Sequence, residues 1–593
     1  MTELSAGAAP RYGAVGWAFV FVAFAIGFFN YPLQVVGRGF EYVPGDVIDN
    51  RLNNFVLEHG YQYLTGKVDR FWDSGAYYPV RGVTAWSDAH IGMLPLYSGL
   101  RAVGFSTERA FQGWFLIPFA LNFAAAAWAA RRLGLGPVGA AAAAFVFAYG
   151  LPLAAQAGHS QLVPRFLAPL ALVFAWEWLR APRSTWRAAA VAACAVYQTY
   201  ISVYIGYFVV LTLAAGSGCA LVLSRGRLPW RDIVRPGARV WAARLGVVLV
   251  AAAALKPLVN AHTRAGSELP RDHIHDTAPR HLAWITPPGM SARYPDLAAY
   301  TKMGSTMEGA GEEQLLPGVL PLAAVALGIA CAAVVLVRRR GLGDTASAVA
   351  VAACTALLLA LLVTKFGEKG RVWFYEPLLA LPGAGGIRAV SRVVLVLLFP
   401  AGFALGAVLD LAARRAARAW PAAGAAVAVL ALLAVAADQR LVSVTGERKD
   451  DWWWTRTPVE ECQKRRGRVV AALRPHSDAA LVYVFPSAAN WLGAGGPSAL
   501  QMDVLLATQE LGLRTPNGYS GRTPDNWSGN PPPDWGPPAG YRALLKWLTE
   551  TNAVPADVID GLVVFGEPAA DADPAFDAAM RRRFPPRPIP EKP

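Results

Sequence analysis

Long apolar runs separated by polar segments dominate the chain from residue 14 to residue 437. Each run has about 17 to 25 residues, the length at which an α-helix spans ~30 Å of hydrocarbon. The pattern predicts about eleven membrane spans, and the expected fold is mainly α, a polytopic transmembrane helical bundle. The predicted spans are residues 14–36, 110–130, 136–156, 162–179, 186–201, 202–223, 241–259, 315–337, 345–364, 391–412 and 420–437.

Arginine residues follow every second predicted span. Because basic residues in short loops are retained in the cytoplasm, this alternation predicts a cytoplasmic N-terminus, residues 1–13. That segment has no basic start and no small-residue cleavage site, so the first span is expected to remain as an anchor. The basic residues are Arg131, Arg132, Arg180, Arg183, Arg187, Arg225, Arg227, Arg231, Arg235, Arg338, Arg339, Arg340, Arg414, Arg415 and Arg418.

The remaining connections are predicted to face outward, and they hold most of the chemically varied residues. They are residues 37–109, 260–314 and 365–390, and everything after residue 437. In the last segment, apolar runs at residues 480–485 and 562–565 alternate with a helical pattern at 541–547, as in a small α/β domain. We therefore expect a transmembrane module at residues 14–437 and an extracytoplasmic α/β domain at residues 438–593.

Composition agrees with a chain that uses the bilayer as its solvent. Of the 593 residues, 54% are hydrophobic and only 16% are charged, against roughly 25% charged in an average soluble domain. The net charge of +14 does not indicate nucleic acid, because the arginines form no continuous basic stripe. Four of the five cysteines fall in apolar runs, so no disulfide framework or zinc spacing follows.

Carboxylates in the first outward loop are the first candidates for chemistry. Asp46 and Asp49 come about ten residues after a predicted span, and Asp88 follows in an aromatic-rich stretch. A carboxylate at this depth can act as a general base or hold a cation. Asp beside Gly is equally common in turns and helix caps, so a structural role stays open.

Cations at the predicted outward ends of spans are the second candidates. Charged groups near hydrocarbon usually face a cavity or a partner, and converging Arg and Lys bind phosphate. Snorkelling to lipid headgroups is the alternative for each residue alone. His159 and Gln161 lie nearby in the sequence and could hydrogen-bond a substrate. The candidate phosphate-binding residues are Arg165, Lys256, Arg388 and Arg392.

Several segments, in order along the chain, resemble bacterial members of the GT-C superfamily of membrane glycosyltransferases, including the YfhO-like group. They are Gly45-Asp46-x-x-Asp49-Asn50, Leu57-Glu58-His59, Phe71-Trp72, Tyr77-Tyr78-Pro79, Ser87-Asp88, Ala157-Gly-His-Ser-Gln161, Gly386-Ile-Arg-Ala-Val-Ser-Arg392 and Asn517-Gly-Tyr-Ser-Gly521. Together they cover most of the chain, although each alone is a weak signal.

The resemblance implies a sugar donor carried on polyprenyl phosphate and transfer outside the cytoplasm. It implies Asp46 as base or metal ligand, with Asp49 or Asp88 in support. Many members carry two adjacent acidic residues, whereas Asp46 and Asp49 are three apart, so dependence on Mg²⁺ or Mn²⁺ is left open. The expected substrate-binding residues are Glu58, His59, His90, His159 and Gln161.

The function expected from these patterns is sugar transfer of the inverting kind to a lipid, glycan or protein hydroxyl. Membrane lipids are further expected partners, and nucleic acid is not. A lipid-linked sugar flippase is the first alternative, although no repeat between halves supports it. A non-catalytic scaffold is the second. The expected location is a bacterial inner membrane, with the C-terminal domain periplasmic or extracellular.

Overall fold

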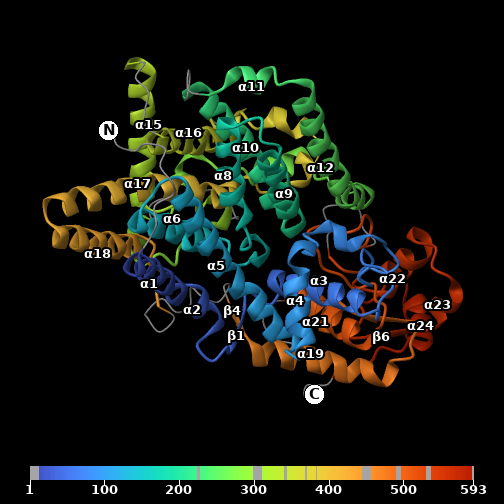
Figure 1. Ribbon diagram of the computed structural model, residues 1–593. Helices are drawn as coiled ribbons and strands as arrows, with labels where there is room; N and C mark the ends of the chain where they lie inside the picture. Colours follow the sequence, from blue (N-terminus) through green and yellow to red (C-terminus); the bar gives the residue numbers. More distant parts are fainter. Residues whose placement is uncertain are drawn as a thin grey trace. The chain divides into compact units, whose positions relative to one another are not determined.

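The computed structural model divides the chain into two compact units. It describes residues 13–223, 228–266, 268–297, 310–338, 344–367, 370–381, 383–443, 456–488, 496–528 and 536–589. Unit 1 is Met1–Arg38, Trp114–Leu258 and Glu268–Trp452, and unit 2 is Gly39–Gly113, Val259–Ser267 and Trp453–Pro593. Figure 1 follows the chain through the two units by colour, from blue at the N-terminus to red at the C-terminus. The predicted cytoplasmic segment 1–13 lies almost wholly outside the described residues.

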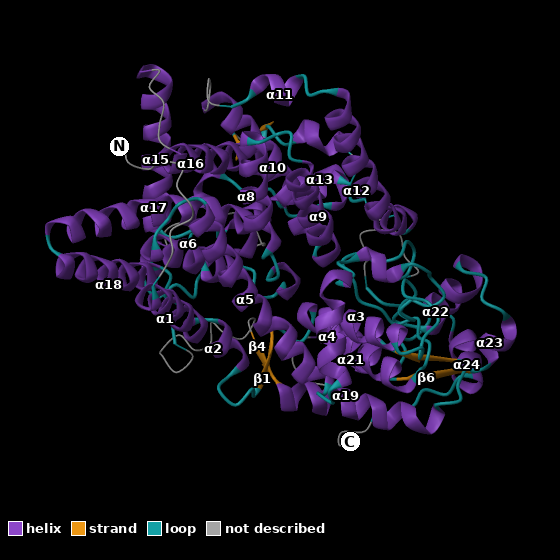
Figure 2. Ribbon diagram, in the orientation of Figure 1, coloured by secondary structure: helices purple, strands orange, loops and turns teal. Residues whose placement is uncertain are grey.

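Helices account for nearly all of unit 1 (Figure 2). Within the described residues, nine helical segments are long and apolar enough to cross a membrane. Every predicted span coincides with a helix, which confirms the polytopic helical class. Two of these helices are not among the nine segments, because α9 has only 17 residues and the apolar stretch of α15 is shorter. The long helices are α1 Ala14–Asn30, α5 Thr107–Arg132, α6 Pro137–Tyr149, α8 Leu167–Arg180, α9 Thr185–Ile201, α10 Val203–Leu223, α12 Ala238–Arg264, α15 Val319–Arg338, α16 Asp344–Val363, α17 Val394–Ala419 and α18 Pro421–Asp438.

Short elements complete unit 1 at the ends of these helices. Strands β2 and β3, of two residues each, pair in antiparallel register. Single-turn 3₁₀ helices η3, η5 and η9 carry several of the predicted site residues. The short elements are α2 Pro32–Val36, α7 Leu151–Ala155, η3 Ser160–Leu162, α11 Trp230–Val234, α13 Arg271–Asp276, η4 His281–Ile285, η5 Ala310–Glu313, β2 Lys365–Phe366, β3 Val372–Trp373, η7 Glu376–Ala380, η8 Ala384–Gly386 and η9 Val390–Val393.

Helices α6 and α17 form the buried centre of unit 1. Their backbones touch at a glycine pair: a Cβ built on Gly139 would lie 2.6 Å from the carbonyl oxygen of Gly406, and one on Gly406 would lie 2.3 Å from that of Gly139. No larger residue fits at either position, which is the way small residues bring membrane helices together. The Asp410 carboxylate of α17 then accepts a hydrogen bond, 3.0 Å long, from the Gly136 amide that precedes α6.

Unit 2 is a mixed α and β unit built from both ends of the chain. Strands β5 and β6 pair in parallel, Leu481 opposite Leu562, which confirms the strands expected there. Strands β1 and β4 pair antiparallel, Tyr42 opposite Pro458. Its elements are β1 Tyr42–Pro44, α3 Asp49–Leu64, η1 Val83–Trp86, η2 Ile91–Met93, α4 Leu94–Ala102, β4 Arg456–Pro458, α19 Val459–Leu473, η11 Arg474–His476, β5 Leu481–Val484, η12 Pro486–Ala488, α21 Gly496–Leu511, α22 Tyr541–Lys546, α23 Ala556–Asp560, β6 Leu562–Phe565 and α24 Pro574–Arg583.

The association of the first outward loop with the C-terminal segment is the main feature that the sequence pattern does not signal. A buried ionic cluster fixes it. Asp503 of α21 is fully buried; its carboxylate accepts from Arg51 of α3 at 2.5 Å and from Arg465 of α19 at 2.8 Å. The three helices are thus joined by charges that are out of reach of water, where an unmatched charge is costly.

Replacing Asp503 with Ala is expected to destabilise unit 2 by about 3–5 kcal/mol, because two buried guanidinium groups lose their counter-charge. The measurement is the apparent melting temperature of the full-length protein in detergent. Asp560→Ala is the control: its pair with Arg583 is exposed, 62% and 50% at the side chains, and is expected to change stability by less than about 1 kcal/mol. Equal effects of the two variants would contradict the role assigned to the cluster.

Candidate active site

Asp46 lies in a tight turn between β1 and α3 in unit 2. Gly45, just before it, has a φ of 83°, and a Cβ there would lie 1.5 Å from the side-chain nitrogen of Asn50. Only glycine therefore permits this turn. The Asp46 carboxylate accepts a hydrogen bond from the Ile48 amide at 3.0 Å. This contact forms an Asx turn. The half-buried carboxylate is therefore held by a backbone of fixed conformation.

The environment of Asp46 suits a group that exchanges a proton. Burial raises the pKa of its carboxyl, and the nearby charge of Asp49 raises it further, while amide donors including Ile48 oppose the shift. A carboxylate whose pKa moves toward neutrality is a better general base than an ordinary surface Asp. The predicted role of Asp46 as a base stays a prediction, but the chemistry of its surroundings favours it.

Asp49 begins α3 and has a partner from the C-terminal part of the chain. The hydroxyl of Tyr519 donates to its Oδ1 atom at 2.5 Å. Tyr519 was not among the predicted site residues, although the surrounding segment, residues 517–521, is part of the family resemblance. Only that resemblance could have drawn attention to it, because a tyrosine 470 residues away has no local relation to Asp49.

Asp88, the third predicted carboxylate, is buried at 9% exposure in the same unit. Its neighbour Ser87 also meets the C-terminal segment, with its hydroxyl oxygen 3.3 Å from that of Ser520. The burial of Asp88 fits a supporting role better than direct contact with a substrate. Its proposed support of Asp46 stays a prediction.

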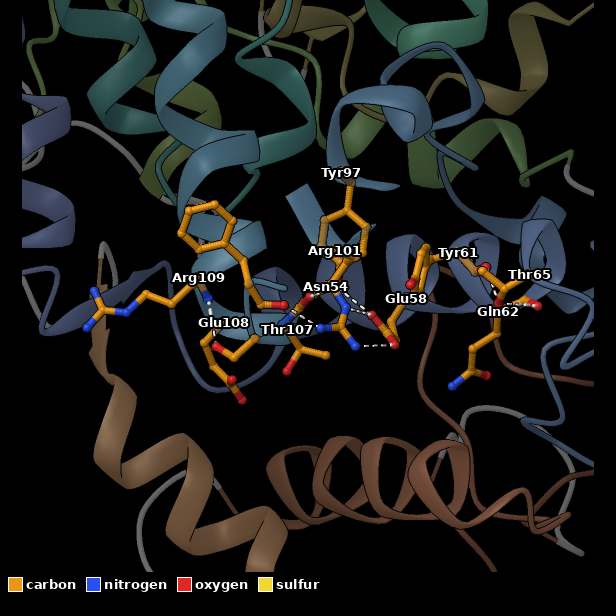
Figure 3. A network of polar contacts seen from close by, with 12 residues as sticks. Asn54, Glu58, Tyr61, Gln62, Thr65, Tyr97, Arg101, Thr107, Glu108 and Arg109 are labelled. Atoms are coloured by element: carbon orange, nitrogen blue, oxygen red, sulfur yellow. Dashed lines mark hydrogen bonds and ion pairs between the residues drawn. The ribbon is translucent and has the colours of Figure 1, made fainter. Parts of the chain in front are cut away.

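Glu58, a predicted substrate-binding residue, lies inside a network that clips α3 to α4 (Figure 3). Its Oε2 atom accepts from Arg101 Nε at 2.8 Å and from the Tyr97 hydroxyl at 2.8 Å. Asn54, one turn earlier, accepts from the same hydroxyl at 3.2 Å. Since both oxygens of Glu58 contact Arg101, the network argues for a structural role and against substrate binding.

The two predicted histidines of the first loop are also held internally. His59 contacts the carbonyl oxygen of Phe71 at 2.9 Å, and His90 contacts Asn53 at 3.0 Å. Burial lowers the pKa of both, that of His90 to about 3. His90 is therefore neutral at physiological pH and cannot offer a positive charge to a substrate. These contacts argue against the substrate-binding role expected for both.

In unit 1, Arg392 and Glu312 form a nearly buried ion pair. Arg392 Nη2 lies 2.7 Å from Glu312 Oε1, with side-chain exposures of 3% and 13%. Ser391 donates to the other carboxylate oxygen at 2.6 Å, and His159 lies 3.0 Å from Arg392. The structure thus joins two predicted site residues, Arg392 and His159, around Glu312, which was not among the predicted site residues.

The carboxylate of Glu312 is kept ionised by this cluster. Burial acts to raise its pKa, but the Arg392 charge, His159 and the hydrogen bonds of Ser391 and Arg392 outweigh it, so the net pKa is lowered. Arg392 is consequently matched by an internal anion and is not an open cation. Arg392 could bind a donor phosphate, as expected, only if Glu312 moved away from its guanidinium.

Arg388 is a predicted phosphate-binding cation that remains available in unit 1. Its amide donates to the Tyr204 hydroxyl at 3.1 Å, and its carbonyl accepts from Thr277 at 2.6 Å, so the backbone is held on both sides. Its half-buried side chain makes no hydrogen bond or ion pair within the described parts of the chain. A fixed backbone with an uncommitted guanidinium is a favourable arrangement for holding an anion.

The two other cations differ from Arg388 and from each other. Arg165 is fully buried and donates to the carbonyls of Phe147 and, at 3.1 Å, Val163, which argues against binding a donor. Lys256 is exposed on α12, as expected of a residue that reaches a headgroup. Gln161, in η3, is half-buried, and its predicted role is neither favoured nor opposed.

The possible metal site is limited to the Asp46 and Asp49 pair. Among the described residues, no group of three or more His, Cys, Asp or Glu side chains gathers in an arrangement that could hold a metal ion. Two carboxylates, one already accepting from Tyr519, are fewer ligands than the six oxygens that Mg²⁺ prefers. The pair could hold a cation only with substrate or water oxygens, so metal dependence stays open.

No protein-family model and no curated protein matches this chain. Solved structures do. The apo oligosaccharyltransferase of Archaeoglobus fulgidus matches with a TM-score of 0.46 and 12% identity, over 83% of this chain and 64% of its own. ArnT from Cupriavidus metallidurans matches with TM-scores of 0.35 in the apo state and 0.34 bound to undecaprenyl phosphate, at 13% and 14% identity, each over 97% of this chain and 90% of its own.

These likenesses are distant. The chain spans 64% of the length of the archaeal enzyme, and identities of 12–14% do not transfer an activity or a ligand. The finer resemblance to the YfhO-like group stays a prediction. The evidence for a function therefore comes from the residues of this chain.

The Glu312–Arg392 pair is expected to make stability depend on pH in a defined direction. Because the folded pKa of Glu312 is lowered from 4.5, the pair stabilises fully above that pH and is lost as pH falls through the folded pKa. The difference in apparent melting temperature between wild type and Glu312→Gln should thus be greatest above pH 4.5 and shrink as the pH falls below it, through the lowered pKa of the folded protein.

The control for this experiment is Glu376→Gln, which breaks the exposed pair with Arg271. An exposed pair contributes little, so this variant should follow wild type at every pH. A difference between wild type and Glu312→Gln that stays constant from neutral pH down to the lowest pH at which both proteins remain folded would contradict the ionised pair.

Proposed function

We propose that this chain is a GT-C-type membrane glycosyltransferase, which moves a sugar from a polyprenyl-phosphate carrier to a hydroxyl group of an extracytoplasmic acceptor. The observation that carries the proposal is the Asp46 turn. A half-buried carboxylate with a raised pKa, next to a second carboxylate, lies in the segment where the family resemblance expects the base. The nine apolar helices supply the membrane setting that a lipid-linked donor requires.

The reaction proposed for Asp46 is a direct displacement. The acceptor oxygen forms a bond to the anomeric carbon of the sugar as its proton passes to the Asp46 carboxylate. The bond from that carbon to the phosphate oxygen breaks, and its electron pair leaves with the polyprenyl phosphate. One displacement inverts the anomeric centre, which is the outcome we propose. General base assistance of this kind contributes about 10²–10⁴-fold to the rate.

Arg388 is proposed to bind the phosphate of the donor in unit 1. Its guanidinium offers a fork of donors that matches two phosphate oxygens, and it is not neutralised by an internal anion as Arg392 is. Charge develops on the phosphate as the sugar leaves, so a cation at this position also stabilises the transition state. Lys256 and Arg392 stay secondary candidates for the same role.

A divalent cation is not required by this proposal. If one binds, Asp46 and Asp49 would hold it, and it would neutralise charge on the leaving phosphate. The proposed location is a bacterial inner membrane.

Asp46→Asn is expected to lower the transfer rate by on the order of 10²–10⁴-fold, because the amide keeps the shape of the side chain and loses the base. The measurement uses purified protein in lipid nanodiscs with a panel of synthetic undecaprenyl-phosphate monosaccharides as donors. Asp69→Asn, an exposed Asp of the same loop, is the control and should transfer at the wild-type rate. Wild-type transfer by Asp46→Asn would refute the assignment.

Arg388→Ala is expected to raise the KM for the same donors about 10- to 100-fold, the loss expected for hydrogen bonds to a charged group. Arg388→Lys should recover only part of it, because an ammonium keeps the charge and not the fork. Arg293→Ala removes an exposed cation from unit 1 and controls for net charge. If Arg293→Ala raised KM as much as Arg388→Ala did, a specific phosphate contact would be excluded.

A further inference from the structure

The ion pair of Arg392 and Glu312 in unit 1 is open to solvent on its anionic side. The Glu312 side chain is 13% exposed and that of Arg392 only 3%. In the Asp503 cluster of unit 2, by contrast, the side chains of both arginines and of the carboxylate are at most 5% exposed. A ligand that approaches Arg392 therefore meets the Glu312 carboxylate first.

Four donor groups from the described part of the chain converge on this carboxylate. Arg392 donates to Oε1 from Nε at 3.0 Å and from Nη2 at 2.7 Å. The Ser391 hydroxyl donates to Oε2 at 2.6 Å, and the Gln156 amide lies 3.5 Å from the same oxygen. The three donor residues are buried. A guanidinium fork and a hydroxyl that hold two carboxylate oxygens match two oxygens of a phosphate equally well.

Tyr204 connects this anion site with Arg388, the cation proposed to bind the donor phosphate. The Arg392 guanidinium lies over the Tyr204 ring, 5.0 Å from its centroid. The Tyr204 hydroxyl accepts from the Arg388 amide at 3.1 Å. One side chain of α10 thus contacts both arginine residues, which places the Arg388 backbone beside the anion site.

We propose that Glu312 is an internal competitor of the ligand: its carboxylate occupies the anion site of Arg392 and Ser391 until the phosphate group of a lipid-linked ligand displaces it. The inference rests on the proposed function, which supplies a lipid-linked phosphate as the ligand. The exchange replaces one anion by another, so the buried guanidinium is never left unmatched. Glu312 moves to the solvent on the side where it is already exposed.

The displacement is a rotation of the Glu312 side chain on a backbone that stays in place. Directly after η5, the amides of Leu315 and Leu316 donate to the carbonyls of Ala283 and Thr286 at 3.0 and 3.1 Å. The competition lowers the apparent affinity for phosphate by the fraction of molecules in which the site is free of Glu312. It therefore also favours the release of the polyprenyl phosphate that remains after sugar transfer.

The direct test follows Glu312 in the full-length wild-type protein in nanodiscs. A water-soluble carbodiimide with glycine ethyl ester modifies accessible carboxyl groups, and peptide mass spectrometry reports the modified fraction of Glu312. Farnesyl phosphate, a short lipid phosphate, is expected to raise this fraction severalfold, because the displaced carboxylate loses its contacts with Arg392 and Ser391. An unchanged fraction, or protection of Glu312, would overturn the proposal.

Two controls separate displacement from other effects of the ligand. Farnesol has the same chain without the phosphate and should leave the modification of Glu312 unchanged; an equal rise with farnesol would overturn the proposal. Glu376, exposed in its pair with Arg271, should be modified equally with and without farnesyl phosphate. A rise of the same size at Glu376 would show a general effect and overturn the proposal too.

Inorganic phosphate distinguishes a lipid-linked phosphate from a free one. It offers the same oxygens to Arg392 without an apolar chain, so it is expected to release Glu312 only at a much higher concentration than farnesyl phosphate does. Release of Glu312 at equal concentrations of the two probes would overturn the assignment of a lipid-linked ligand.

A variant of Glu312 tests the competition itself. Glu312→Gln keeps the shape of the side chain and removes its charge, so the dissociation constant of farnesyl phosphate, measured by titration calorimetry, is expected to fall about 10- to 100-fold, the range for hydrogen bonds to a charged group. Glu376→Gln removes the same charge from the same unit and should bind as wild type does. Equal affinities of wild type and Glu312→Gln would overturn the proposal.

The route of the effect is tested by adding Arg392→Gln to Glu312→Gln, which should cancel the gain in affinity. A gain that persists in the double variant would show that Glu312 does not act through Arg392, and the proposal would be wrong. A purely structural counter-ion would lower stability when replaced and would not tighten binding. If Glu312→Gln does not fold, the modification of Glu312 in wild type decides.

These outcomes can be told apart from those of the proposed function, because labelling and binding require no sugar transfer. Active Asp46→Asn protein would remove the base assignment and leave the release of Glu312 as measured. If Glu312 is not displaced, the phosphate contact stays with Arg388, and an inactive Asp46→Asn variant still supports the base.

Discussion

Two guanidinium groups, those of Arg51 and Arg465, are buried against one carboxylate, that of Asp503. This match joins α3 of the first outward loop to α19 and α21 of the C-terminal segment. Arg51 lies in the first turn of α3, so the cluster fixes the helix that Asp49 begins. Strand β1 is held by β4 on the other side of the Asp46 turn. The turn is therefore fixed at both ends by segments from the last quarter of the chain.

Internal matching of charge also explains which predicted residues stay open to a ligand. Glu58 is matched by Arg101 and Arg392 by Glu312, while Arg165 is surrounded by carbonyls. Burying these groups without such partners would cost several kcal/mol each. Asp46 and Arg388 differ, because neither has a counter-charge among its described contacts. The Asp46 carboxylate in unit 2 and the Arg388 guanidinium in unit 1 are therefore among the predicted site residues that stay open to a ligand.

The helices were predictable because each apolar run carries its own signal in length and hydropathy, and the strands at residues 480–485 and 562–565 stood out as short apolar runs. The candidate site was predictable only in part. Asp46 and Asp49 could be named from a local Gly-Asp pattern. Tyr519 and Glu312 could not be assigned partners, because their contacts join segments that are 470 and 80 residues apart in the sequence. The periodicity of a segment indicates which face of a helix or strand is buried, but not which distant residue that face contacts.

The pairing of β1 with β4 also sets an order of events during synthesis. The hydroxyl of Thr457 donates to the carbonyl of Gly45 across 412 residues. At about 5–20 residues per second, the ribosome needs roughly 20–80 s to make the intervening chain. Throughout that interval the Asp46 turn lacks its β4 partner, its Arg51 lacks Asp503, and the first loop waits as an incomplete unit. The carboxylate site is thus among the last parts of the molecule to form, and a chain that ends early carries its helices without it.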